Sequence, residues 1–180
     1  IDDFGILTPD RIEELYHNVS QSEWIDDVQE KKNYNKGTYD ALKGYKLRNP
    51  KQKSGANLNV LRKEMGIEVI KNIRQSSQSN LFFIEAPTGA GKTNLSILAT
   101  IELLKIHKGQ YNKVFYVFPF TTLITQTYTV VRDMLGLKED EIIELHSKAG
   151  LKSTQHEDDL YGGEKLNYIN HLFVNYPFCL

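Results

Sequence analysis

Residues 81–105 read LFFIEAPTGAGKTNLSILATIELLK, and this stretch decides the fold. An apolar run at 81–84 stops at a Gly-rich turn, and Lys92 with Thr93 then opens an apolar helix predicted over 93–106. Glycines in such a turn let successive N–H groups point at phosphate oxygens, while the helix N-terminus adds its dipole. The pattern G-x-G-K-T between a strand and a helix therefore predicts a phosphate-binding loop.

The residues of this loop have separate chemical roles in that interpretation. Lys92 can reach the β- and γ-phosphates of ATP, and the hydroxyl of Thr93 can ligand Mg²⁺. The alternative is an ordinary strand-to-helix turn with a lysine at the helix start, but the full string rarely arises by chance. The strict pattern begins with glycine, whereas this loop begins with alanine. The predicted nucleotide ligands are Ala86, Pro87, Thr88, Gly89, Ala90, Gly91, Lys92 and Thr93.

Strand and helix patterns alternate along the chain after residue 80. The apolar runs at 81–84 and 114–118 are continuous, as in strands that are covered on both faces. A helix from about Thr122 and a short strand at 142–145 follow. This order predicts an α/β, RecA-like P-loop domain, in which a parallel sheet has helices on both faces. The ligand should lie beyond the carboxyl ends of the strands.

Four segments together resemble a known family. They are IEAPTGAGKT at 84–93, FPFTTLITQ at 118–126, ELHSKAGL at 144–151 and FVNYPFC at 173–179. The order of these segments along the chain resembles the order of the motifs in superfamily 2 helicases. Their amino-acid sequences are similar to those of the CRISPR-associated helicase/nuclease of type I interference systems. The resemblance covers residues 57–180 and implies the first RecA-like domain of an ATP-dependent motor that steps along single-stranded DNA.

The resemblance also implies which residues touch nucleic acid. The turn after 114–118 corresponds to motif Ia, and the turn after the expected strand at 172–174 corresponds to motif Ib. Both turns contact the nucleic-acid backbone in that superfamily. Hydroxyls at the start of the following helix could instead cap that helix. The expected contacts are Pro119, Thr121, Thr122, Asn175, Tyr176 and Pro177.

The first 56 residues are more polar and predict a mainly helical extension, with helices near 9–18 and 22–31. Residues 43–63 then carry seven basic side chains and no acid, which indicates either a solvated linker or a contact with nucleic acid or a partner domain. The expected domains are therefore 1–56, the extension, and 57–180, the RecA-like domain. Asn59 and Arg62 fall where superfamily 2 proteins recognise adenine, although a helix surface explains them almost as well.

Bulk composition limits the other possibilities. Of the 180 residues, 40% are hydrophobic and 25% are charged, as in globular proteins, and the net charge of −1 means that any surface for nucleic acid must be local. No apolar run is long enough to span a membrane, and a cytoplasmic location is expected. A single cysteine, Cys179, allows neither an internal disulfide nor a cysteine metal site.

The sequence contains no convincing candidates for the acids that position the metal and the attacking water. Glu157, Asp158 and Asp159 follow a polar segment rather than an apolar strand, so they are interpreted as a surface loop. The resemblance implies that motif II lies beyond Leu180 and that a metal-dependent nuclease domain lies upstream, since none of the five histidines precedes an aspartate. Both chain ends are interpreted as cuts within a longer protein.

These expectations leave alternatives open. The parent protein would contain a second RecA-like domain and would work with single-stranded DNA and a CRISPR effector complex, while the 180-residue chain alone would hydrolyse little ATP. Another superfamily 2 motor, such as a restriction-enzyme translocase subunit, fits the same motifs. A regulatory module that binds nucleotide and never hydrolyses it also fits the same motifs.

Overall fold

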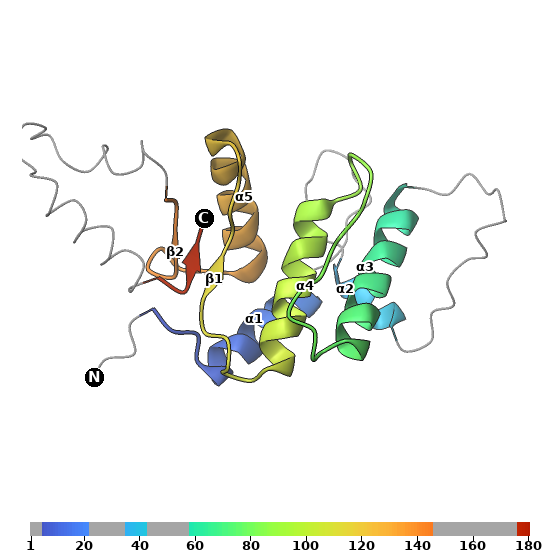
Figure 1. The fold of residues 1–180 in the computed structure, drawn as a ribbon, viewed down its shortest axis with the longest axis horizontal. Helices are drawn as coiled ribbons and strands as arrows, with labels where there is room; N and C mark the ends of the chain where they lie inside the picture. Colours follow the sequence, from blue (N-terminus) through green and yellow to red (C-terminus); the bar gives the residue numbers. More distant parts are fainter. Residues whose placement is uncertain (1–4, 22–34, 43–57, 146–175) are drawn as a thin grey trace, which may run out of the picture. The chain divides into compact units, whose positions relative to one another are not determined.

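The computed structural model describes residues 5–21, 35–42, 58–145 and 176–180. These ranges contain five helices and three short strands (Figure 1). They fall into two compact units, one made of Ile1–Pro9 with Gly109–Leu180 and the other of Asp10–Lys108. Each unit has its own core and is described by itself.

The unit Asp10–Lys108 is helical. Its elements are α1 (Pro9–Gln21), α2 (Asn35–Ala41), α3 (Leu58–Gln75) and α4 (Lys92–Ile106). Helix α3 packs against both α2 and α4 (Figure 1). Helix α4 is apolar on most sides, as its sequence predicts, and it contributes much of the core. The fully buried side chains of this unit include Ile12, Leu15, Val19, Ile67, Ile70, Leu95, Ile97, Leu98 and Ile101.

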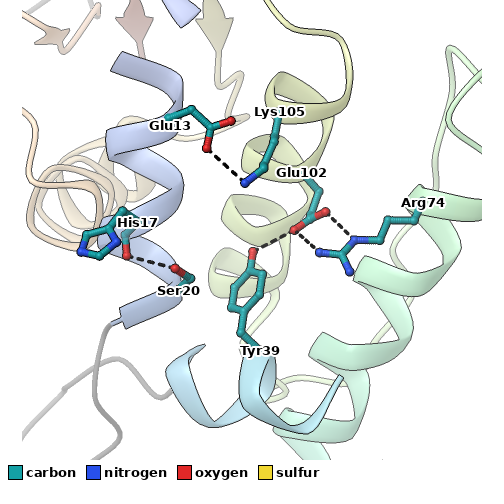
Figure 2. Close-up of polar contacts among 7 residues, drawn as sticks. All are labelled: Glu13, His17, Ser20, Tyr39, Arg74, Glu102 and Lys105. Carbon is teal, nitrogen blue, oxygen red and sulfur yellow. Dashed lines mark hydrogen bonds and ion pairs between the residues drawn. The ribbon is translucent and has the colours of Figure 1, made fainter. Parts of the chain in front are cut away.

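A polar cluster joins three of these helices. The carboxylate of Glu102 in α4 is only 2% exposed, and it accepts hydrogen bonds from Arg74 of α3 and from Tyr39 of α2 (Figure 2). Nearby, the Nζ of Lys105 lies 3.1 Å from Glu13 Oε2 of α1. These contacts tie α1 and α2, which belong to the predicted extension, to the helix that follows the predicted phosphate-binding loop. The domain division at residue 57 remains a prediction.

The second unit contains a parallel sheet. Its strands are β1 (Val114–Phe115), β2 (Ile142–Ile143) and β3 (Phe178–Cys179), in the order β1-β3-β2, and the fully buried Phe178 pairs with Val114 on one side and Ile142 on the other. Helix α5 (Thr121–Leu135) starts one residue before its predicted position and contacts β2. The α/β class and the parallel sheet are thus confirmed.

One expected strand is not formed. Residues 81–84 belong to no strand, and the side chains of Leu81 and Phe83 are 68% and 86% exposed. None of the hydrogen bonds among the described residues involves the backbone of residues 82–84. A strand exists only when a neighbour accepts and donates its backbone hydrogen bonds, and the described ranges hold no such neighbour for this run.

The other strands are shorter than predicted, or differently placed. The strand expected at 114–118 pairs through residue 115, with one further bond from Tyr116 N to Cys179 O, and the strand expected at 142–145 ends at Ile143. The strand expected at 172–174 lies outside the described residues. In the part of the chain that the structure describes, none of the helices combines the length and apolar character that crossing a membrane requires.

Candidate functional site

The loop at 86–91 has the backbone shape that its sequence predicts. Gly89 and Gly91 have φ values of 81° and 83°, in the left-handed region that only glycine adopts readily. Between them Ala90 is buried, at 2% exposure, and its N–H donates to Pro87 O at 3.2 Å. A Cβ added at Gly89 would meet nothing within 4 Å, so the glycine there is needed for its backbone angle and not for lack of space.

Helix α4 begins directly after this loop. Gly91 is its N-cap and provides no side-chain hydrogen bond to the first turn. The first helical bond runs from Leu95 N to Gly91 O at 3.0 Å. A helix start without a side-chain cap favours an anion, because its first N–H groups point outward and carry the positive end of the helix dipole.

Lys92 and Thr93 occupy the first two positions of α4, and both side chains are exposed. The Nζ of Lys92 turns back over the loop and donates to Ala86 O at 2.6 Å and to Pro87 O at 3.2 Å. The ammonium is therefore held at the start of the loop by two backbone carbonyls, with which phosphate oxygens would compete. Thr93 presents a hydroxyl at the same helix end, which suits a hard cation such as Mg²⁺.

Arg62 of α3 also reaches the loop. Its guanidinium donates to the carbonyl oxygen of Gly89 from Nε at 3.1 Å and from Nη2 at 2.7 Å. The resemblance to superfamily 2 proteins implied a contact with adenine, and it gave no sign of this contact with the loop. Asn59, the other residue expected to recognise adenine, lies one helical turn earlier in α3.

The predicted motif Ia residues lie where the sequence places them. Pro119 follows β1, and Thr121 and Thr122 are the first two residues of α5, all with exposed side chains. The N-cap of α5 is Phe120, and no side chain caps the helix by a hydrogen bond. The hydroxyls of the two threonines therefore do not serve as the cap of this helix, which was the alternative explanation for them.

The predicted motif Ib residues are arranged differently. Asn175 lies outside the described residues. Tyr176 and Pro177 precede β3, so they lie at the amino end of that strand, whereas Thr121 lies beyond the carboxyl end of β1. Because β1 and β3 are parallel, these two positions are at opposite ends of the sheet. The structure thus does not bring Tyr176 and Pro177 together with the motif Ia turn.

Acidic and metal-binding candidates add little to this site. Glu157, Asp158 and Asp159 all lie outside the described residues. Within the described ranges, no three His, Cys, Asp or Glu side chains are grouped as a metal site requires. Thr93 remains the predicted ligand for Mg²⁺.

Comparison with known proteins agrees with these features. The family model described as DEAD/DEAH box helicase matches residues 65–175, which is more than half of the chain. The match includes the predicted phosphate-binding loop, α4 and α5. No curated protein and no solved structure matches the chain. The resemblance to superfamily 2 helicases is thereby confirmed at the level of the family, and the chain belongs to the DEAD/DEAH box helicases.

Proposed function

We propose that residues 86–93 bind ATP together with Mg²⁺, and that the chain is the nucleotide-binding part of a motor that moves along single-stranded DNA. The observation that carries the proposal is the loop itself. Two left-handed glycines flank the buried Ala90, and Lys92 folds back over the carbonyls of the same loop. A left-handed glycine turn at a helix N-terminus, with a lysine beside it, is the kind of backbone that can hold a polyphosphate.

Each part of the loop would act on the nucleotide in a distinct way. Lys92 would exchange its two carbonyl partners for phosphate oxygens, which form stronger, charge-assisted hydrogen bonds. The dipole of α4 would favour the negative charge of the phosphates. Thr93 would hold Mg²⁺, which neutralises charge on the phosphates during phosphoryl transfer.

Hydrolysis needs more than this loop. Phosphoryl transfer requires a carboxylate to hold the metal and a group to orient water, and no Asp-Glu pair follows a strand among the described residues. We therefore expect the 180-residue chain to bind nucleotide and to hydrolyse it slowly. Efficient turnover would depend on motif II and on a second RecA-like domain of the parent protein.

The proposed DNA contacts are Pro119, Thr121 and Thr122. They are exposed beyond the carboxyl end of β1, which is the edge where parallel α/β sheets bind their ligands. Threonine hydroxyls and backbone N–H groups would bind phosphates and would not read the sequence of the strand. Tyr176 and Pro177, at the amino end of β3, have less support in this role.

A place in type I CRISPR interference is the finer part of the proposal. It is supported by the amino-acid sequences of the four segments at 84–93, 118–126, 144–151 and 173–179. A CRISPR effector complex would then recruit the motor, and a nuclease domain would accompany it in the parent protein. Activity of that parent on DNA unwound by such a complex would test this assignment.

The phosphate-binding loop is tested by nucleotide titration. Lys92→Ala should weaken binding of a fluorescent ATP analogue with Mg²⁺ by about tenfold to a hundredfold, because the variant has no ammonium to donate charge-assisted hydrogen bonds to the phosphates. Lys138→Ala, at an exposed lysine outside the loop, is the matched control. If a folded Lys92→Ala protein binds nucleotide as the wild type does, the loop is not the nucleotide site.

A further inference from the structure

The short helix α2 is hydrogen-bonded to α4 at two points. Three positions of α4 spaced by four residues, 94, 98 and 102, are involved. Asn35 is hydrogen-bonded to Asn94, and Tyr39 to Glu102. Between these two contacts, Thr38 of α2 and Leu98 of α4 both lie beside Gly66 of α3, because a Cβ added there would lie 3.1 Å from Thr38 Cγ2 and 3.3 Å from Leu98 Cδ1. Positions 94, 98 and 102 form a strip on one face of α4, and α2 is hydrogen-bonded to the two ends of this strip.

The contact at the loop end of this strip is a reciprocal pair of amides. Asn35 Nδ2 donates to Asn94 Oδ1 at 3.1 Å, and Asn94 Nδ2 donates to Asn35 Oδ1 at 2.9 Å. Asn35 is fully buried. Two antiparallel hydrogen bonds between side-chain amides fix both the separation and the relative orientation of the two side chains. An apolar contact would leave the side chains free to slide.

The position of Asn94 gives this pair its significance. It is the third residue of α4, immediately after Lys92 and Thr93, and therefore belongs to the same helical turn. No side chain caps that turn, because its N-cap is Gly91. The side chain of Asn35 is hydrogen-bonded to this first turn from outside α4.

The far end of the strip is held separately. Tyr39 Oη lies 3.1 Å from Glu102 Oε1, and Arg74 reaches the same carboxylate from Nε at 2.9 Å and from Nη2 at 3.1 Å (Figure 2). Eight residues of helix, about 12 Å along the axis, separate position 102 from position 94. Tyr39 therefore anchors α2 at a distance from the phosphate-binding loop, and Asn35 acts at the loop end.

We propose that Asn35 is a positioning residue for nucleotide binding. By holding Asn94, it fixes the first turn of α4 in the orientation in which Lys92, Thr93 and the N–H groups of that turn converge on the phosphates. The segment before residue 57 would then be a working part of the nucleotide site. This inference rests on the proposed nucleotide binding and adds to it a residue outside the loop.

The test compares nucleotide affinity with stability in the full chain. The probe is a fluorescent ADP analogue with Mg²⁺, and the variants are Asn35→Ala, Asn94→Ala and the double variant. Removing one oriented hydrogen-bonded pair should raise the Kd by about threefold to tenfold. The double variant should bind no more weakly than the weaker single variant, because both substitutions remove the same pair of hydrogen bonds.

Tyr39→Phe is the matched control. It also removes one hydrogen bond between α2 and α4, but at the far end of the strip. It should lower the Tm and leave the Kd for the analogue unchanged. This split between Tm and Kd separates positioning of the loop from general support of the fold.

The outcomes distinguish the two levels of the proposal. If the wild type fails to bind the analogue, the proposed function fails. If the wild type binds, and Asn35→Ala and Asn94→Ala lower the Tm without changing the Kd, the positioning role is overturned and the loop assignment stands. Should Asn35→Ala not fold, Asn94→Ala decides alone, since its side chain is partly exposed and alanine suits a helix.

Discussion

Arg62 places two guanidinium nitrogens on the carbonyl oxygen of Gly89, Nε at 3.1 Å and Nη2 at 2.7 Å. The planar guanidinium offers these donors in a fixed geometry, so the contact orients the carbonyl as well as attracting it. Gly89 has a φ of 81°, and the carbonyl belongs to the part of the loop that is proposed to curl around phosphate. Helix α3 therefore holds the tip of the loop from outside.

The contact between Arg62 and Gly89 predicts how Arg62 variants bind phosphate ligands that lack a nucleobase. Arg62→Ala should weaken binding of Mg²⁺-ATP by about threefold to tenfold, and Arg62→Lys should be intermediate because it keeps one donor and the charge. Binding of inorganic tripolyphosphate, measured by calorimetry, should weaken by the same factor. A weakening confined to ATP would instead assign Arg62 to adenine recognition, as the resemblance to superfamily 2 proteins implied.

Gly66 should tolerate alanine only when Thr38 is made smaller. Alanine favours a helix interior over glycine by about 1 kcal/mol, but its Cβ would lie 3.1 Å from Thr38 Cγ2. Gly66→Ala should therefore destabilise the protein despite its better helix propensity, by about 1 kcal/mol in urea unfolding. Combining it with Thr38→Ser, which removes that methyl group, should give a protein more stable than the sum of the two single changes predicts.

Tyr39 should make stability fall at high pH. Burial, with the neighbouring Glu102 carboxylate, raises the pKa of Tyr39 far above its ordinary value of 10.0. Above pH 10 the unfolded chain loses this proton while the folded chain keeps it, so the free energy of unfolding should fall by about 1.4 kcal/mol per pH unit from this group. Below pH 10 the contribution is fully present.

The comparison with Tyr39→Phe isolates that effect. The variant lacks the titrating group, so its unfolding free energy should fall less steeply than that of the wild type between pH 10 and about pH 11.5. The difference between the two slopes should correspond to the release of one proton on unfolding. Chemical denaturation at several pH values measures both slopes. Equal slopes would mean that Tyr39 ionises as easily in the folded protein as in the unfolded chain.

Thr121 and Thr122 should contribute to DNA binding. Replacing both with valine in the full-length protein removes two hydroxyls with little change in volume, and should weaken binding to single-stranded DNA and DNA-stimulated ATP hydrolysis. Because binding to phosphates releases counterions, the salt dependence should also become shallower, by about 0.7 in log-log slope for each phosphate that the variant no longer binds. Thr129→Val is the control, at an exposed threonine further along α5. Unchanged DNA affinity would remove these threonines from the proposed interface.

The sequence predicted those features that local chemistry determines. The loop needs left-handed backbone at Gly89 and Gly91, and glycine spacing alone is enough to indicate it. The start of α5 near Thr122 and of α1 near Pro9 follow from proline and threonine preferences at helix starts. In each case the information lies within a few residues of the feature.

Features that depend on distant partners were not predictable in this way. The apolar run at 81–84 looks like a strand, but a strand also needs a neighbour, which no local pattern supplies. Asn35 is one polar residue in a polar segment, and only the fold brings it to Asn94. Glu102 is a lone acid within the apolar helix α4, which indicates that it has a buried partner. The sequence does not identify Arg74 or Tyr39 as that partner.

The exposed run at 81–84 also has a consequence for how the protein behaves at high concentration. Apolar side chains on an extended backbone form a template to which another extended chain can add by strand pairing. Leu81 and Phe83 are exposed in this way. Self-association during purification should therefore involve this segment, and a charged substitution at Phe83 should reduce it.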